Sequence, residues 1–242
     1  MNAMLRPEST VAAIATEIPG AAGVFERMGI DYCCGGKRTL EQACTIANLS
    51  IDEVLSRLER LSTEQKATDG QDFSSMSLTD LIGHITATHH VFVRQESPRI
   101  QELSAKVVAK HGGKHPELRQ VQEVFDALAA ELSLHLMKEE QVLFPYVQQL
   151  EEAELAGEPA PPTMFGTVAN PIHMMEREHD GAGEALRGLR SFTHDYTLPE
   201  DACTSLQLLY QGLQAFEADL HQHIHLENNL LFPRALAMEA KR

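Results

Sequence analysis

His135-Leu-Met-Lys-Glu139, followed by Leu143-Phe144-Pro145, recurs later in the chain as His223-Ile-His-Leu-Glu227 followed by Leu231-Phe232-Pro233. Each position of the second copy comes 88 residues after its counterpart, as His223 does after His135. A further pair of motifs precedes these two, His84-x5-His90 and His173-x5-His179, with an offset of 89 residues. The chain therefore contains two related halves, each ending in a His-x3-Glu motif and a Leu-Phe-Pro sequence.

Both His-x3-Glu motifs continue an apolar helical face. Residues i and i+4 of a helix lie on the same side, so the histidine and glutamate of each motif are neighbours. Apolar residues at helical spacing precede the motifs, namely Val121, Val124, Leu128 and Leu132 in the first half and Leu206, Leu209, Leu213, Phe216 and Leu220 in the second. Extending each face by the same steps reaches the histidine and then the glutamate, which predicts that these ionisable side chains lie in the core.

Two buried carboxylates and several buried imidazoles need a compensating charge. Without one, each buried ion costs several kcal/mol, against a total stability of roughly 5–15 kcal/mol for a domain. A buried ion pair or polar network would explain a single His–Glu pair. Two pairs at matching positions of a repeat, with two further matched histidines, favour a bound metal cation.

The pattern resembles hemerythrin-like domains, which are four-helix bundles that hold two irons between helices, with His-x3-Glu motifs on the second and fourth helix. Ferritin-like di-iron proteins use Glu-x2-His motifs, which this chain lacks at the corresponding places. The resemblance implies an all-α fold with an up-down four-helix bundle. It also implies that two iron ions per chain, joined by an oxo bridge, have His90, His135, His179 and His223 as terminal ligands and Glu139 and Glu227 as bridging ligands. Oxygen-carrying hemerythrins use five histidines, so a site with four argues against simple oxygen carriage.

The metal cannot be chosen from the ligand types alone. Imidazole and carboxylate suit iron or manganese, and zinc accepts the same ligands. Glu140, beside Glu139, points about 100° away and is expected to face solvent or to support a ligand. Asp180, which follows His179, could orient an imidazole.

Charge and composition bound the class of protein. The 242 residues include 20 Lys and Arg against 35 Asp and Glu, a formal net charge of −15, which argues against nucleic acid and anionic membranes as partners. The first ten residues carry an acidic residue and a proline where a secretory signal would be apolar, and no run of 18 apolar residues occurs. We therefore expect a cytoplasmic protein whose four cysteines are reduced thiols.

A small all-helical unit is expected at the N-terminus. Helices are predicted from Ser9 or Thr10 to Pro19-Gly20 and from about residue 21 to 28, and capping boxes at Thr39 and Ser50 predict two further helix starts. Between the second and third helices lies Asp31-Tyr32-Cys33-Cys34-Gly35-Gly36-Lys37. A nearby lysine and open backbone N–H groups would stabilise thiolate, which makes Cys33 and Cys34 candidates for redox, metal or nitric oxide chemistry. The alternative is a loop whose cysteines only pack.

This cysteine motif ahead of a hemerythrin-like bundle resembles the iron–sulfur cluster repair family (repair of iron centres, ScdA/YtfE-type). Its members join a short cysteine-bearing domain to a di-iron bundle. The resemblance implies that the protein protects or restores iron–sulfur clusters damaged by nitric oxide or peroxide, by iron donation or by nitric oxide handling. It implies damaged iron–sulfur proteins as partners, nitric oxide, oxygen or peroxide as small ligands, and a homodimer.

The domain boundary is placed in the polar stretch of residues 62–77, which lacks apolar periodicity. This predicts an N-terminal domain of residues 1–65 and a bundle of residues 76–242. The bundle helices are expected to start near residue 77, at Pro116, at Pro171 and after Pro199, with the Pro/Gly-rich residues 156–170 between the halves. Pro98 and Pro145 are expected to interrupt or kink their helices.

The remaining histidines and cysteines receive simpler interpretations. His89 is expected to be a solvated neighbour of His90, while His84 and His173 could support or replace a ligand. His111 and His115 fall in a turn, and His221 and His225 face away from His223. Cys44 and Cys203 are interpreted as small packing residues.

Three classes of function remain open. The first is a repair factor, which is not an enzyme in the narrow sense, with Cys33 and Cys34 handling thiol or nitrosyl chemistry. The second is a nitric oxide or peroxide reductase acting at the di-iron site. The third is an oxygen or nitric oxide sensor of hemerythrin type. A cysteine-bearing domain favours the first class, because a carrier or sensor would not need it.

Overall fold

The computed structural model describes residues 5–64 and 72–240. These residues are helical throughout, apart from their connecting segments and one isolated bridge between Thr10 and Thr39, so the all-α prediction is confirmed. The chain divides into two compact units: Met1–Ile82, Gln148–Pro161 and His221–Arg242 form unit 1, and Gly83–Val147 and Pro162–Leu220 form unit 2. Part of the predicted domain boundary, residues 65–71, lies outside the described residues, and the two-domain division stays a prediction.

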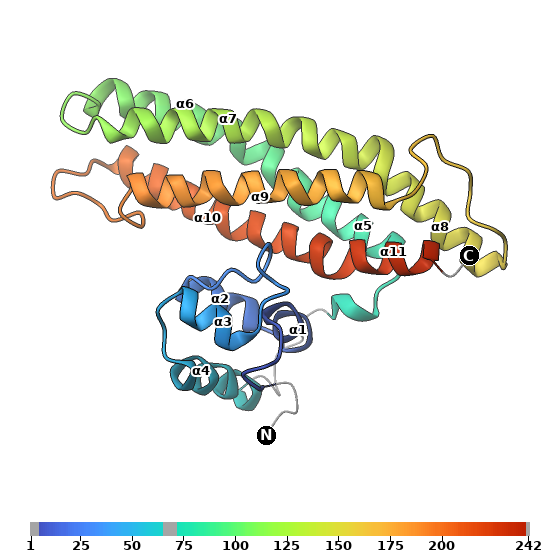
Figure 1. The fold of residues 1–242 in the computed structure, drawn as a ribbon. Coiled ribbons are helices and arrows are strands. Elements are labelled where there is room, and N and C mark those ends of the chain that lie inside the picture. Colours follow the sequence, from blue (N-terminus) through green and yellow to red (C-terminus); the bar gives the residue numbers. More distant parts are fainter. Residues whose placement is uncertain (1–4, 65–71, 241–242) are drawn as a thin grey trace. The chain divides into compact units, whose positions relative to one another are not determined.

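Four short helices form the N-terminal part of unit 1 (Figure 1): α1 (Val11–Glu17), α2 (Ala21–Met28), α3 (Leu40–Ile46) and α4 (Ile51–Glu64). The predicted capping box is present at α3, where the Thr39 hydroxyl accepts from the Gln42 N–H at 3.2 Å and the Gln42 side chain accepts from the Thr39 N–H at 3.1 Å. The helices bury one apolar core that includes Ile14, Phe25, Leu40 and Leu58, all fully buried.

The rest of unit 1 consists of helix ends and short segments: η1 (Phe73–Ser75), the start of α5 (Leu78–Ile85), the end of α8 (Phe144–Ala156), residues 221–226 of α10 (Thr204–Leu226), η4 (Glu227–Leu231) and α11 (Phe232–Ala240). Two long-range contacts hold these segments together. The Glu151 carboxylate accepts from the first N–H groups of α5, at Leu78 (2.6 Å) and Thr79 (2.8 Å), and so caps that helix. Arg234 donates to the Met76 carbonyl at 2.6 Å.

Four helices pack around one core in unit 2: α6 (Val91–His111), α7 (Glu117–Lys138), α9 (Ala169–Phe192) and α10 up to residue 220 (Figure 1). Phe125 of α7 and Phe216 of α10 meet edge to face at 5.1 Å, and both are buried. Arg190 of α9 donates to Glu217 of α10 at 2.7 Å. The predicted four-helix bundle is confirmed, with its first turn at residues 112–116 as expected.

Short π-helical turns interrupt the α-helices at η2 (Thr86–His90), η3 (Glu139–Leu143) and η4. In η3 the Phe144 N–H donates to the carbonyl of Glu139, five residues back, and in η4 Phe232 donates to Glu227 in the same way. A proline follows each of these two donors and has no N–H of its own to donate within the helix. Pro145 follows a π turn, whereas α6 continues through Pro98, so of the two expected effects of Pro98 the interruption does not occur and the kink stays a prediction.

Candidate metal centre

The centre of unit 2 holds a cluster of buried imidazoles and one carboxylate. His135, Glu139 and His179 offer ligand atoms that all lie within 4.8 Å of one another. His135 Nε2 lies 3.1 Å from His179 Nε2 and 3.1 Å from Glu139 Oε1, and His90 Nε2 lies 3.4 Å from Glu139 Oε2. None of the four residues is more than 2% exposed. Three helical segments, η2, the α7–η3 junction and α9, thus bring four of the six predicted ligands together.

Two glutamates orient the outer nitrogens of this cluster. Glu140 Oε1 lies 2.7 Å from His90 Nδ1, and Glu178 Oε2 lies 2.8 Å from His135 Nδ1. Each carboxylate has a cation on its other side, Arg94 at 2.8 Å from Glu140 and Lys138 against Glu178. Such contacts fix the ring and leave Nε2 directed into the cluster. Glu140 therefore contacts a predicted ligand, as one of the two sequence interpretations expected.

Both outer glutamates are held in the ionised form. Burial alone raises the pKa of Glu178, but its hydrogen bonds with Lys138 and His135 outweigh burial and lower the pKa below its ordinary value. For Glu140, the hydrogen bonds with Arg94 and His90 likewise outweigh burial and lower the pKa. Glu178 was not predicted from the sequence, which offered Asp180 for this role; Asp180 is exposed.

The remaining predicted ligands belong to unit 1. His223 Nε2 lies 3.2 Å from Glu227 Oε1, and both residues are fully buried. Glu227 is the first residue of η4, as Glu139 is of η3, so the two His-x3-Glu motifs have the same local structure. The prediction that both motifs lie in the core is confirmed.

The donor set fits a divalent metal. Glu139 and Glu227 are carboxylates with no exposed surface, and each lies beside imidazole nitrogens at distances of 3.1–3.4 Å. Buried carboxylates need a nearby positive charge, and imidazole with carboxylate is a ligand set that iron, manganese and zinc all accept.

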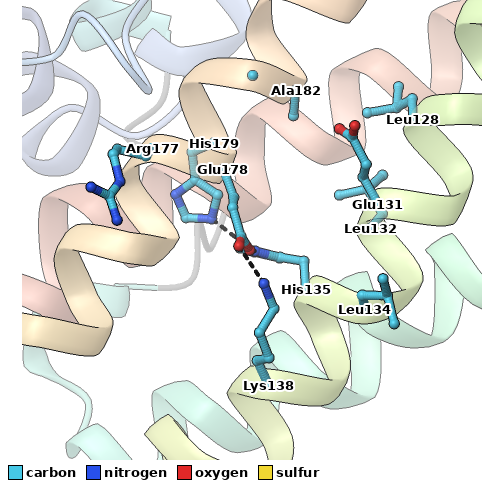
Figure 2. A pocket seen from close by; sticks show the side chains of 11 residues that line it. Leu128, Glu131, Leu132, Leu134, His135, Lys138, Arg177, Glu178, His179 and Ala182 are labelled. Carbon is cyan, nitrogen blue, oxygen red and sulfur yellow. Dashed lines mark hydrogen bonds and ion pairs between the residues drawn. The ribbon is translucent and has the colours of Figure 1, made fainter. Parts of the chain in front are cut away.

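A pocket of about 390 Å³ lies between α7 and α9 and is lined by His135 and His179 (Figure 2). Its other walls combine apolar and charged side chains: Leu128, Glu131, Leu132, Leu134, Lys138, Arg177, Glu178, Gly181 and Ala182. Figure 2 shows the Glu178 carboxylate between His135 and Lys138, at the edge of this pocket. Small molecules that occupy the pocket would lie against two of the clustered imidazoles.

Of the other histidines, His89 differs from the sequence interpretation. His89 is buried, only 4% exposed, and its Nδ1 lies 3.0 Å from Asp219 of α10, so the expectation of a solvated side chain is wrong. His173 is exposed, and His84 is half-buried, with Nδ1 3.5 Å from the Thr88 hydroxyl. His225 is buried, and burial lowers its pKa to about 4.

The cysteine loop of unit 1 is organised by a carboxylate. Asp31 Oδ1 accepts from the N–H groups of Cys34 (3.0 Å) and Gly35 (2.9 Å), and the Cys33 thiol lies 3.6 Å from the same oxygen. The open N–H groups expected to stabilise a thiolate thus bind Asp31 instead. The hydrogen bond with Cys34, together with burial, raises the pKa of Cys33 well above its ordinary value, which disfavours the thiolate form of this residue.

Within unit 1 the cysteine loop lies against the segment that carries Glu227. The Asn229 side-chain amide donates to the carbonyls of Tyr32 (3.1 Å) and Cys33 (3.4 Å) and lies 2.9 Å from His225 Nδ1. The Tyr32 and His225 rings are in contact, with centroids 5.3 Å apart. The two cysteine sulfurs lie 3.9 Å apart and do not form a disulfide bond.

Two family models match the chain. Residues 7–62 match ScdA_N, described as a domain of unknown function (DUF542), and residues 80–235 match the hemerythrin HHE cation binding domain. The iron-sulfur cluster repair protein YtfE of Yersinia pseudotuberculosis serotype IB (strain PB1/+) is 38% identical over 230 residues, which is 95% of this chain and 97% of the relative. The protein of the same name from Yersinia pestis (strain Pestoides F) is similar to the same extent. Among the described residues, no helix combines the length and the apolar character needed to span a membrane.

Proposed function

The chain belongs to the hemerythrin HHE family and to the iron–sulfur cluster repair proteins named YtfE, and on this premise we propose that it repairs or protects iron–sulfur clusters damaged by nitrosative or oxidative stress. The observation that carries the proposal is the buried cluster of His135, Glu139 and His179, with His90 beside it. A protein whose core holds this donor set at the expense of apolar packing is built around a metal.

We propose that His90, His135, His179 and His223 bind two oxo-bridged iron ions, with Glu139 and Glu227 as ligands of both. The contact of 3.1 Å between His135 Nε2 and His179 Nε2 supports this assignment. Two imidazole nitrogens directed at one point are placed to share a cation. Iron held by these residues would supply redox chemistry and open positions for nitric oxide, oxygen or peroxide.

The residues around the cluster control the ligands. Glu178 and Glu140 hold the Nδ1 protons of His135 and His90, so that each Nε2 keeps its lone pair for the ion. Lys138 and Arg94 keep both glutamates ionised. The pocket between α7 and α9 provides a path for small molecules to His135 and His179 without opening the bundle.

Cys33 and Cys34 are proposed to serve the repair reaction through thiol or nitrosyl chemistry. Cys33 is 5% exposed and Cys34 is half-buried, so Cys34 is the sulfur that a reactant meets first. Their loop is held by Asp31 and by Asn229, two residues after the proposed ligand Glu227. This connection within unit 1 offers a route by which the state of the metal ligands and that of the cysteine loop influence each other.

The remaining aspects of the proposal concern the cellular setting. Its partners would be damaged iron–sulfur proteins, its small ligands nitric oxide, oxygen or peroxide, and its location the cytoplasm, where the four free cysteines stay reduced. Residues 1–65 and 76–242 would act as two domains, and the family resemblance suggests a homodimer.

A second candidate function is reduction of nitric oxide or peroxide, which the pocket at His135 and His179 favours because it admits a small substrate. The two functions differ in turnover. A reductase consumes nitric oxide or peroxide repeatedly when a reductant is supplied, whereas a repair factor restores a damaged cluster without steady consumption. Long-lived reversible binding of oxygen, with neither activity, would indicate a sensor.

The central test is metal content in variants. His135→Ala combined with Glu139→Ala should remove most of the bound iron while the far-ultraviolet circular dichroism spectrum keeps its helical form, since all four bundle helices retain their other core residues. His173→Ala, which changes an exposed histidine of the same bundle, is the control and should keep the iron. The wild type and the control should restore activity to a [4Fe–4S] enzyme inactivated by nitric oxide, and the double variant should not. Full iron retention in the double variant would overturn the metal assignment.

A further inference from the structure

A cysteine and a histidine meet at the end of the bundle formed by the α6–α7 turn and the start of α10. Cys203 immediately precedes α10, and its Sγ lies 3.0 Å from Nε2 of His111, the last residue of α6. Both side chains are half-buried. The interpretation of Cys203 as a simple packing residue is therefore wrong, because its sulfur faces an imidazole that lies 92 positions away in the sequence.

The backbone of α10 adds to this environment. The N–H groups of Leu206 and Ser205, in the first turn of the helix, hydrogen-bond the sulfur, and with the positive charge of Lys110 they lower the pKa of Cys203 below its ordinary value. The first N–H groups of a helix have no partner within the helix and stabilise a negative charge. Cys203 thus combines an amide-stabilised sulfur with an adjacent imidazole, whereas the pKa of Cys33 is shifted in the opposite direction.

This pair is remote from the proposed metal ligands. His90 immediately precedes α6 and His111 is its last residue, and a helix of 21 residues spans about 30 Å. Reactivity at Cys203 would therefore be independent of the metal cluster.

We propose that Cys203 and His111 form a peroxide-reactive thiol–imidazole pair, and hence a site of oxidation outside the metal centre. His111 takes the thiol proton. The sulfur attacks one peroxide oxygen, the O–O bond breaks, and the departing hydroxide or alkoxide takes the proton back from His111. The products are a sulfenic acid and water or an alcohol. The sulfur loses the two electrons that the peroxide gains.

The exposure of the pair favours a small electrophile. The half-buried position of Cys203 is sufficient for a peroxide but restricts the approach of a bulky disulfide. The His111 ring lies close enough to the sulfur to return its proton to the second peroxide oxygen, which leaves when the O–O bond breaks. Peroxide is therefore the reactant class to which we commit.

The test measures sulfenic acid formation at Cys203 in the full chain, loaded with iron. The reduced protein is treated with a small excess of hydrogen peroxide, trapped with a dione reagent and digested for mass spectrometry. An ordinary thiol is only a few per cent ionised at pH 7, so Cys203 should react roughly tenfold or more faster than the same cysteine in a synthetic peptide of residues 200–207. Iodoacetamide labelling across pH gives an independent measure of ionisation, and its midpoint for Cys203 should lie below that of the peptide.

Two histidine variants separate the pair from its surroundings. His111→Gln should slow peroxide oxidation of Cys203 and move the labelling midpoint to higher pH. His115→Asn is the matched control, because His115 lies in the same turn but contacts Asp201 and Glu117, and it should change neither. In the His135→Ala, Glu139→Ala variant, hydrogen peroxide should oxidise Cys203 at the wild-type rate.

Three results would overturn the proposal. Cys203 reacting no faster than the peptide would show an ordinary thiol. An unchanged rate and midpoint in His111→Gln, with its helical circular dichroism intact, would remove the imidazole from the reaction. A rate that falls with loss of the metal ligands would make bound iron the source of the oxidant.

Discussion

Replacement of Glu178 by glutamine tests how the bundle tunes its proposed metal ligands. The substitution keeps the shape of the side chain and an oxygen that can face His135 Nδ1, but it removes the negative charge now held 2.8 Å from that nitrogen. The imidazole then becomes a weaker base, and its ring is less firmly oriented toward Glu139 and His179.

The expected loss of metal affinity follows from the position of the Glu178 carboxylate. Removing a carboxylate that orients a ligating histidine typically weakens metal affinity 10- to 100-fold, or about 1.4–2.7 kcal/mol. The Glu178 side chain is 33% exposed, so water screens part of its effect, and we expect a loss near the lower end, about tenfold. Glu140→Gln should have a similar effect through His90, because the Glu140 side chain is 27% exposed and its contact is 2.7 Å.

The assay is anaerobic competition for ferrous iron between the protein and a chromogenic chelator. Glu184→Gln is the matched control on the same helix, since Glu184 is 76% exposed and pairs with Arg187, away from the cluster. Circular dichroism of the metal-free proteins should show equal helicity. Wild-type affinity in both Glu178→Gln and Glu140→Gln, to within about twofold, would refute the argument that these carboxylates prepare the histidines.

Three further predictions follow from contacts described above. Asp31→Ala should free the loop N–H groups and accelerate alkylation of Cys33 in the folded protein, as monitored by mass spectrometry. An unchanged rate of alkylation would mean that burial alone protects the thiol. The pKa of His115 is raised by its hydrogen bond with Asp201, so the pair stabilises the fold below about pH 6.5 and loses this effect as pH rises through the folded-state pKa. In the wild type, the unfolding free energy should therefore decrease by less than about 1 kcal/mol between pH 6 and pH 8, as measured by urea denaturation. His115→Asn should abolish this decrease, and an equal decrease in the variant would contradict the role of the pair. Phe125→Ala should lower the unfolding free energy by about 3–5 kcal/mol, because the ring is fully buried against Phe216, and a loss below about 1 kcal/mol in the same assay would show that the core repacks.

The bundle and its ligand-bearing faces were predictable because they depend on periodicity. The step from Leu132 to His135 and Glu139 follows the helical repeat, and these residues are buried as that repeat requires. The repeat also selected His90 over His89 by its match to His179. The burial of His89 was not predictable, since its contact with Asp219 joins segments 130 residues apart.

Contacts between helices determine the features of the site that could not be predicted from the sequence. Glu178 precedes His179 on α9, yet it serves His135 on α7, and no spacing within one helix encodes that pairing. The cysteine loop shows a similar limit. Glycines and a lysine suggested a thiolate, but the hydrogen bond with Cys34 and burial raise the pKa of Cys33, and two of the loop N–H groups bind Asp31.

The π-helical turns have a consequence for how this protein can evolve or be redesigned. Each of η3 and η4 holds one residue more than an α-helix would use over the same rise, so it behaves as a single-residue insertion placed at a glutamate. Deleting one residue there would restore a regular helix but rotate everything beyond it by about 100°. Selection for helix stability alone would favour such a deletion. Both halves nevertheless carry the insertion, which indicates that the position of the glutamates matters more than the helix stability that the deletion would add.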